Sequence, residues 1–200
     1  MTAELKVFNR WSTDGIEVKD PGLKNYITLQ PRIVPKTGAK YGGQKFYKSK
    51  IFIVERFINK LMAAGHKGKK HKVTSERNTG KAITSYNLVE QAFEIIEKKT
   101  QKNPIEVFIR ALENAAPREE IITIEYGGAR YPKAVEVAPQ RRIDIALRYM
   151  AQGSYQSAYD AKKTSVNAIV DEITNAFMLN TQSIAVAKKY ELERQADSSR

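Results

Sequence analysis

A short segment of strand-like sequence lies between two long blocks of helical sequence and limits the folds open to this chain. Residues 121–126 and 134–137 are rich in β-branched and apolar residues and flank the pair Gly127 and Gly128. Adjacent glycines can take the positive φ angles of a two-residue turn, so this spacing predicts an antiparallel hairpin. Because Pro132 cannot donate to a further strand, the hairpin should project as a two-stranded arm and not lie inside a larger sheet.

The predicted hairpin covers residues 119–138 and has a preferred register. Pairing Glu125 with Arg130 and Ile124 with Tyr131 places opposite charges and apolar groups face to face across the strands. A two-stranded ribbon is marginally stable by itself, so its base should lean on helices and its tip should meet a partner. An ordinary surface hairpin is the alternative. The candidate contact residues near the tip are Gly127, Gly128, Arg130, Tyr131 and Lys133.

The composition sets the broad class of protein. The chain has 200 residues, of which 42% are hydrophobic, which suffices for one core with or without an extension. It contains no cysteine, which excludes a disulfide framework and cysteine-ligated metal sites. The N-terminus lacks the apolar core of a signal peptide, and no stretch approaches the roughly 18 apolar residues of a membrane span. We therefore expect a soluble cytoplasmic protein with no membrane partner.

The positive charge is concentrated in one part of the chain. The formal net charge is +12, and residues 36–81, called the basic region below, contain thirteen Lys and Arg but only two acidic residues, Glu55 and Glu76. This surplus predicts a polyanionic partner. The glycine-broken run 66–72 is expected to contact phosphates, with a solvated loop as the alternative. The candidate phosphate-binding residues of the basic region are Lys36, Lys40, Lys45, Lys48, Lys50, Arg56, Lys60, Lys67, Lys69, Lys70, Lys72, Arg77 and Lys81.

Six amphipathic helices are predicted from the periodicity of the apolar residues. The best-defined begins after Asn103, which can cap it, with Pro104 at the first helical position and Glu106 placed to reach back to the cap. Two of the helices are expected to end at Gly65 and Gly153. The predicted ranges are 48–64, 80–99, 104–115, 139–153, about 158–179 and about 183–196.

We therefore expect a mainly α fold, a bundle of about six helices with one protruding β-hairpin and an extended N-terminal arm. Residues 1–45 form the arm, an N-terminal extension whose aromatic side chains should pack on the helical domain of residues 46–200. Outside the basic region, outward-facing cations are expected at Arg141, Arg142, Arg148, Lys188, Lys189 and Arg194.

No catalytic constellation can be assembled from the sequence. His66 and His71 lie within the lysine run, where no carboxylate is near in sequence to orient an imidazole ring. Residues 79–82 are similar to the end of a phosphate-binding loop, but Ala82 stands where a Ser or Thr would hold magnesium. We expect neither an enzyme nor a cofactor.

Four segments in order match one known family. They are residues 53–62 (IVERFINKLM), 103–119 (NPIEVFIRALENAAPRE), 127–142 with Gly-Gly-x-x-Tyr followed by Val-Glu-Val-x-Pro-x-Arg-Arg, and 185–194 (AVAKKYELER). Together they resemble small-subunit ribosomal protein seven, and the resemblance covers nearly the whole chain. Residues 8–11 (FNRW) and 17–20 (EVKD) resemble its archaeal and eukaryotic branch, whose eukaryotic member is called small-subunit protein five.

The resemblance implies a protein that binds the 3′ major domain of small-subunit rRNA and organises assembly of the subunit head. It also implies that the hairpin lies near the exit-site tRNA and the mRNA exit path. The cations of the basic region, with Arg141 and Arg142, would contact rRNA, and Lys188 and Lys189 of the last helix would contact RNA. Neighbouring small-subunit proteins, including the one numbered eleven, are the expected protein partners. Residues 195–200 depart from the family by being less basic.

Two other classes are considered beside the resemblance. A β-armed architectural DNA-binding protein would also combine a basic helical body with a two-stranded arm that grips the minor groove. Such arms carry an apolar wedge at the tip, and Pro132 lies near enough to the turn to leave this alternative open. An enzyme acting on RNA would need an acid, base or metal cluster that the sequence does not supply.

Overall fold

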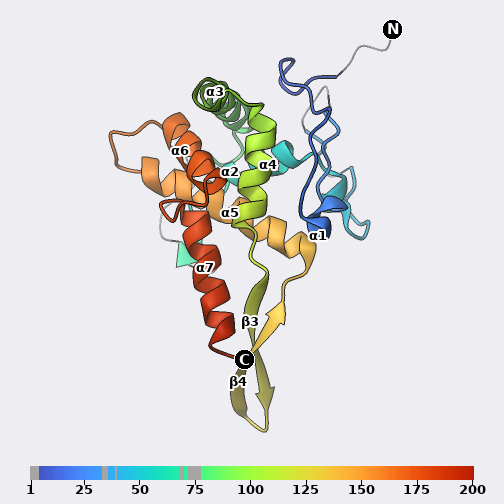
Figure 1. Cartoon of the computed structure of the whole chain (residues 1–200), viewed down its shortest axis with the longest axis vertical. Coiled ribbons are helices and arrows are strands. Elements are labelled where there is room, and N and C mark those ends of the chain that lie inside the picture. The colour runs from blue at the N-terminus through green and yellow to red at the C-terminus, as the bar shows by residue number, and fades with distance from the viewer. Residues whose placement is uncertain (1–4, 33–35, 39, 68–69, 72–77) are drawn as a thin grey trace.

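A computed structural model of the chain describes residues 5–32, 36–38, 40–67, 70–71 and 78–200. Within this part the helices gather at one end and a long hairpin projects from them, with the last helix running beside its base (Figure 1). The predicted mainly α fold with a protruding hairpin is confirmed. The elements are α1 (Pro21–Lys24), a 3-10 helix η1 (Tyr47–Lys50), α2 (Ile53–Leu61), β1 (His66–Lys67), β2 (Lys70–His71), α3 (Ala82–Thr100), α4 (Pro104–Ala115), β3 (Glu119–Tyr126), β4 (Ala129–Glu136), α5 (Pro139–Ala158), α6 (Ser165–Phe177) and α7 (Ile184–Asp197).

Buried aromatic side chains join the helices into one core. Phe108 of α4 lies between Phe57 of α2, at 5.2 Å between ring centroids, and Phe93 of α3, at 5.8 Å. All three side chains are fully buried. Aromatic rings carry more apolar area than any other side chain, so this contact holds α2, α3 and α4 together.

Helix α4 begins and ends where the sequence predicts. The side chain of Asn103 accepts a hydrogen bond from the backbone N–H of Ile105 at 3.0 Å, which satisfies one of the free donors of the first turn. The amide group of Asn103 also donates to the carbonyl of Ser12 at 2.8 Å. The cap of α4 therefore also holds the N-terminal arm.

The N-terminal arm packs on the helices as expected. Val7 and Trp11 are each 5% exposed. The ring of Phe8 lies 4.6 Å from that of Tyr86, and the ring of Trp11 lies 6.0 Å from that of Phe93. The arm therefore contributes side chains to the common core and is not a loose tail over the residues that are described.

The hairpin has the predicted register. Glu125 pairs with Arg130 and Ile124 with Tyr131, while Pro132 faces Thr123 well below the turn. The turn glycines have φ angles of 58° and 80°, the left-handed values that the two-residue turn requires. The two strands form a sheet of their own.

Four helix boundaries differ by several residues from the prediction. Helix α2 starts only at Ile53, after the separate helix η1, and ends at Leu61. Helix α5 continues through Gly153 to Ala158, and α6 begins at Ser165, after the cap residue Thr164. The short helix α1 forms within the arm, which we expected to be extended.

Gly153 does not end α5. It lies inside the helix, where the absence of a side chain permits close packing. A Cβ atom placed there would lie 3.0 Å from the carboxyl group of Glu172 in α6 and from Cβ of Ile184 in α7. The glycine therefore allows three helices to approach closely, a role that depends on residues far away in the chain.

Candidate nucleic-acid interface

A cluster of cations surrounds one carboxylate where η1, α2 and α5 meet. Asp144 of α5 accepts from the ammonium group of Lys48 at 2.7 Å and from the guanidinium of Arg56 at 3.1 Å. The charge of Lys60 interacts with that of Asp144, and Arg148 lies close enough for its charge to interact with Lys60. These five residues are called the Asp144 cluster below. Four positive charges against one negative charge leave the cluster strongly basic.

The titration behaviour of the cluster reflects this imbalance. Burial would raise the pKa of Asp144, but the hydrogen bond from Lys48 and the charges of Arg56 and Lys48 outweigh it and lower that pKa. The pKa of Lys60 is lowered by burial and by its cationic neighbours, although Asp144 opposes this. An added anion would relieve the repulsion among the cations, so the cluster suits a phosphate group.

Arg56, a candidate phosphate-binding residue, lies inside the protein. Its side chain is 5% exposed, and besides Asp144 it contacts the carbonyl of Tyr26 at 3.4 Å. Arg56 can support the positive potential of the cluster, but it cannot reach a phosphate directly. Lys48, with 38% of its side chain exposed, Lys60, which is partly exposed, and Arg148, which is exposed, are the accessible members.

A second cluster combines an aromatic ring with cations. The guanidinium of Arg32 donates to the hydroxyl of Tyr41 at 2.7 Å and lies 5.3 Å from the ring centroid, and the ammonium group of Lys50 lies 6.0 Å from the same centroid. The hydrogen bond from Arg32 and the charges of Arg32, Lys40 and Lys50 lower the pKa of Tyr41, against the opposing effect of burial. The three side chains line an open hollow of about 440 Å³. We call Arg32, Tyr41 and Lys50 the Tyr41 cluster.

Arg32 is a candidate binding residue that the sequence analysis missed. It lies before the basic region, and nothing in the local pattern distinguishes it from other arm residues. Only the fold places it over Tyr41. Rings flanked by cations can stack on unpaired bases while the cations contact phosphates.

The rest of the basic region is partly described. Lys36, Lys40 and Lys45 are exposed, as is Lys81 before α3. The backbone N–H and the hydroxyl of Thr37 donate to one carboxylate oxygen of buried Glu55, at 2.7 and 2.6 Å, which fixes this part of the segment over α2. The backbones of Lys67 and Lys70 pair as β1 and β2. Lys69, Lys72 and Arg77 lie outside the described residues.

The projecting hairpin has one apolar face. Cross-strand partners point to the same side of a ribbon, so Ile122, Ile124 and Tyr126 of β3 share a face with Lys133 and Tyr131 of β4. Tyr126 is 81% exposed and Tyr131 is 58% exposed. The candidate residues of the tip are therefore accessible.

Arg130 lies on the opposite face of the hairpin from the exposed tyrosines. It pairs there with Glu125 at 3.6 Å across the strands. The two faces of the ribbon therefore differ in chemistry, one being aliphatic and aromatic and the other carrying paired charges.

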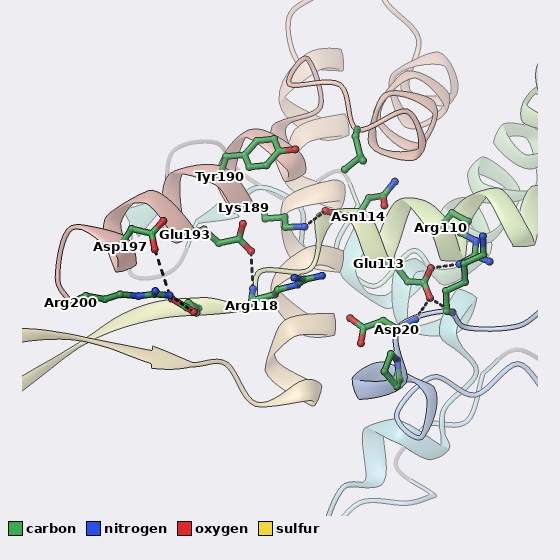
Figure 2. A pocket seen from close by; sticks show the side chains of 14 residues that line it. Asp20, Arg110, Glu113, Asn114, Arg118, Lys189, Tyr190, Glu193, Asp197 and Arg200 are labelled. Carbon is green, nitrogen blue, oxygen red and sulfur yellow. Dashed lines mark hydrogen bonds and ion pairs between the residues drawn. The ribbon is translucent and has the colours of Figure 1, made fainter.

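A separate cleft of about 830 Å³ lies between the N-terminal arm, α4, the base of the hairpin and α7 (Figure 2). Its lining carries five basic and five acidic side chains, in contrast to the Asp144 cluster. This balance does not suit a polyanion. The charged residues are Lys19, Asp20, Arg110, Glu113, Arg118, Glu119, Lys189, Glu193, Asp197 and Arg200.

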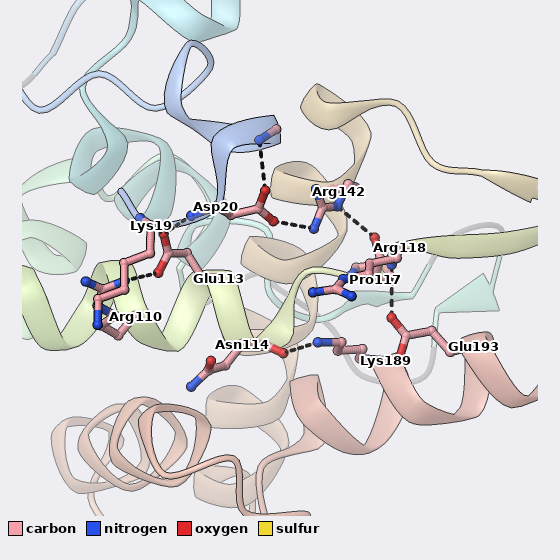
Figure 3. Close-up of polar contacts among 11 residues, drawn as sticks. Lys19, Asp20, Arg110, Glu113, Asn114, Pro117, Arg118, Arg142, Lys189 and Glu193 are labelled. Carbon is pink, nitrogen blue, oxygen red and sulfur yellow. Dashed lines mark hydrogen bonds and ion pairs between the residues drawn. The ribbon is translucent and has the colours of Figure 1, made fainter. Parts of the chain in front are cut away.

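Arg142 is also buried, contrary to the prediction that it lies outside. It donates to Asp20 at 2.7 Å and to the carbonyl of Pro117 at 3.1 Å, so it ties the arm to the start of the hairpin (Figure 3). Its neighbour Arg141 is exposed, with two hydrogen bonds to Glu120 at 2.6 and 2.8 Å. Of this pair, only Arg141 is placed to meet a ligand.

The lysines of the last helix are engaged within the protein. Lys188 pairs with Glu191 one turn further on, and Lys189 donates to the carbonyl of Asn114 at 2.9 Å. Burial lowers the pKa of Lys189, the charge of Glu193 opposes this, and the charges of Arg118 and Arg142 lower the pKa further. Both lysines are only partly exposed, which is less than the outward-facing position that the sequence predicts, and their contact with RNA stays a prediction.

Other kinds of site find no support in the described part of the chain. No group of three or more His, Asp or Glu residues there could hold a metal ion. No described helix is long and apolar enough to cross a membrane.

Comparison with known proteins identifies the family. The family described as ribosomal protein S7p/S5e matches residues 23–200. This chain belongs to the ribosomal protein S7p/S5e family. It is 47% identical to small ribosomal subunit protein uS7 of Nanoarchaeum equitans, over 98% of this chain and the whole of that relative. The uS7 proteins of Archaeoglobus fulgidus and Methanococcus aeolicus are each 46% identical over 98% of this chain, which corresponds to 96% and 100% of their own lengths.

Membership in the S7p/S5e family confirms the resemblance drawn from the sequence, including its archaeal type. The chain is a structural ribosomal protein of the small subunit and not an enzyme. The family match does not favour the alternative of a β-armed DNA-binding protein. In addition, Pro132 lies three residue pairs below the tip of the hairpin, where it could not act as a terminal wedge.

Proposed function

We propose that this chain binds the 3′ major domain of small-subunit rRNA, organises assembly of the subunit head, and extends its hairpin toward the exit-site tRNA and the mRNA exit path. Its partners would be this rRNA, those two ligands, and neighbouring small-subunit proteins, including the one numbered eleven. The observation that carries the proposal is the Asp144 cluster, in which accessible cations outnumber the single carboxylate that they surround.

The Asp144 cluster and the Tyr41 cluster lie near each other because each includes a residue of η1. Lys48 reaches Asp144, while Lys50, two residues later, reaches Tyr41. This arrangement offers phosphate contacts beside a place for an unpaired base. Folded rRNA presents both features, whereas a uniform duplex presents only the first.

The rRNA-binding set that we propose is narrower than the set predicted from sequence. It keeps the accessible cations and adds Arg32, whereas Arg56 and Arg142 act from inside the protein. Lys67, Lys69, Lys70 and Lys72 stay predicted phosphate contacts, as does Arg77. The proposed contact residues of the described surface are Arg32, Lys36, Lys40, Lys45, Lys48, Lys50, Lys60, Lys81, Arg141 and Arg148.

The salt dependence of binding tests this proposal. Affinity for a head-domain rRNA fragment should fall steeply between 50 and 200 mM salt, by about 10³-fold if roughly six phosphates are contacted, taking duplex DNA as a guide. Replacing Lys60 and Arg148 with Ala should reduce the salt slope by about two units. A control that replaces exposed Lys162 and Arg194 removes the same charge elsewhere and should change the slope little. A nearly flat salt dependence for the wild type would refute the proposal.

A further inference from the structure

The acidic side chains of the cleft in Figure 2 are already engaged by the protein itself. One carboxylate oxygen of Glu113 accepts from the backbone N–H groups of Lys19 and Asp20, at 2.6 and 3.0 Å, and the other accepts from the guanidinium of Arg110 at 2.7 Å. Glu113 is therefore neutralised by donors from two segments. It offers nothing further to a ligand.

The carboxylates at the two sides of the cleft are engaged in the same way. Both carboxylate oxygens of Glu119 accept hydrogen bonds from the guanidinium of Arg200 at 2.6 Å. The carboxylate of Asp20 accepts from the guanidinium of Arg142 at 2.7 Å and from the backbone N–H of Gly22 at 2.9 Å. These pairs leave the acidic part of the lining largely compensated.

Some of the cations of the cleft have no such partner. Among the described residues, the ammonium group of Lys19 and the guanidinium of Arg118 make no hydrogen bond or ion pair. Lys189 donates only to a neutral carbonyl, and the charge of Arg118 helps to lower its pKa. Two further carboxylates line the cleft: Glu193 accepts from the backbone N–H of Arg118 at 3.0 Å, and Asp197 lies 3.6 Å from Arg200. The labelled side chains of Arg118 and Lys189 lie side by side in Figure 3.

Two large apolar side chains line the same cleft. Leu179, after α6, is 47% exposed, and Tyr190 of α7 is 45% exposed. Exposed apolar residues beside cations that make no ion pair are typical of a surface that another molecule covers.

We propose that this cleft binds a segment of a neighbouring protein that carries one carboxylate next to an apolar side chain. The carboxylate lies between Arg118 and Lys189, and the apolar side chain packs against Leu179 and Tyr190. The proposal rests on the proposed function, because it places the chain beside other proteins in the assembled subunit.

The lining favours a protein segment over RNA. A nucleic-acid strand carries a negative charge at every nucleotide, and it would bring several of them past Glu193 and Asp197. A protein segment can place a single carboxylate between the two cations and uncharged groups elsewhere. One buried carboxylate paired with a guanidinium gives a strong, directional contact.

Photo-crosslinking in purified small subunits tests the proposal. The full chain carries p-benzoylphenylalanine in place of Tyr190, and a control chain carries it in place of Tyr159, which is 52% exposed at the end of α5 outside the cleft. We expect the probe at position 190 to crosslink to a ribosomal protein segment that mass spectrometry identifies and that contains Asp, Glu or a C-terminal carboxylate. The control should not crosslink to that segment.

A second substitution tests the carboxylate. Arg118→Glu should reduce the yield of this crosslink by about tenfold because two carboxylates then face each other, while Arg118→Lys should retain most of it. Crosslinks from position 190 to rRNA, the absence of a protein crosslink, or an unchanged yield in Arg118→Glu would each overturn the inference.

Incorporation of each variant into subunits is measured in parallel. If the wild type failed to incorporate or to bind head-domain rRNA, the proposed function would be wrong. Normal incorporation without the expected crosslink would refute only the inference about the cleft.

Discussion

Single residues decide how closely the C-terminal helices pack. Glu172 of α6 is 5% exposed, and its carboxylate accepts from the hydroxyl of Ser183 at 2.7 Å and from the backbone N–H of Ala185 at 3.0 Å. Burial raises the pKa of Glu172, and these donors at the start of α7 oppose the rise. Gly153 of α5 provides the space for this group, so one missing side chain permits the junction of three helices.

Gly153→Ala should destabilise the protein by about 1–3 kcal/mol because its Cβ would meet the carboxyl group of Glu172 and Cβ of Ile184 in a packed interior. The free energy of unfolding from urea titration measures the effect. Ser157→Ala, at an exposed position of the same helix, should change it by less than about 0.5 kcal/mol. Equal stabilities of the two variants would show that the junction can relax.

Asp144→Asn should destabilise the protein by about 3 kcal/mol at neutral pH because it leaves the buried guanidinium of Arg56 without its carboxylate. The pKa of Asp144 is lowered in the folded state, so its contribution is present above the ordinary Asp value, about 3.9, and is lost as pH falls through the lowered pKa. The difference between wild type and variant should therefore shrink below about pH 4. Thermal unfolding at several pH values measures it, with exposed Asp160→Asn as the control. A difference independent of pH would contradict this account.

At the scale of elements, the hairpin is held at its base and free beyond it. Arg200, which follows α7, binds Glu119, and Arg141 of α5 binds Glu120, so both faces of the first residues of β3 are tied to the helical part of the protein. Beyond Ile121 every residue of β3 is exposed. The base of the hairpin is therefore part of the helical body, and the outer part extends away from it.

Removal of residues 123–132, with a two-residue turn joining Ile122 to Lys133, should leave the helical core folded. These two residues face each other across the strands, so a tight turn can close the shortened ribbon. Subunits carrying the shortened protein should assemble but should release exit-site tRNA at a changed rate or lose reading-frame maintenance. Purified subunits allow incorporation and tRNA dissociation to be measured together.

In the full-length hairpin, Tyr126→Ala combined with Tyr131→Ala removes the two exposed rings but keeps the length of the arm. Comparing this variant with the shortened protein distinguishes the role of the apolar face from the role of the arm's length. Failure of the shortened protein to incorporate would make the outer hairpin part of the assembly surface. Normal incorporation with unchanged tRNA dissociation and frame maintenance would show that the arm does not act there.

For the whole molecule, the N-terminal arm and the helices share one core. Buried Val7, Trp11, Val18 and Leu23 belong to the same apolar cluster as the side chains of α2 to α6. The division into an extension of residues 1–45 and a helical domain stays a prediction, and the shared core makes it testable through cooperativity.

Trp11→Ala should lower the free energy of unfolding by about 3–5 kcal/mol because the ring is 5% exposed and contacts Phe93 of α3. A single unfolding transition seen by both circular dichroism and tyrosine fluorescence would mean that arm and helices unfold together. Phe46→Ala removes a ring that is 62% exposed and should cost far less. A variant as stable as the wild type, or two separate transitions, would show that the arm is an independent extension.

The sequence by itself determined the features that depend on neighbours along the chain. The cap at Asn103 specified α4, the adjacent glycines specified the turn and register of the hairpin, and the density of lysines located the basic region. Hydrogen bonds within a few residues and the conformational freedom of glycine act locally, so these features can be recognised without the fold.

The tertiary structure alone decided which cations are accessible and which segments meet. Arg56 and Asp144 are 88 residues apart, and Arg142 and Asp20 are 122 apart, so periodicity within one helix could not reveal that these arginines are buried as partners. The close approach at Gly153 and the position of Arg32 over Tyr41 were hidden for the same reason. A charged side chain is buried only where a partner compensates its charge, because removing an unpaired charge from water is costly. Where that partner is distant in the sequence, only the folded chain brings the two together.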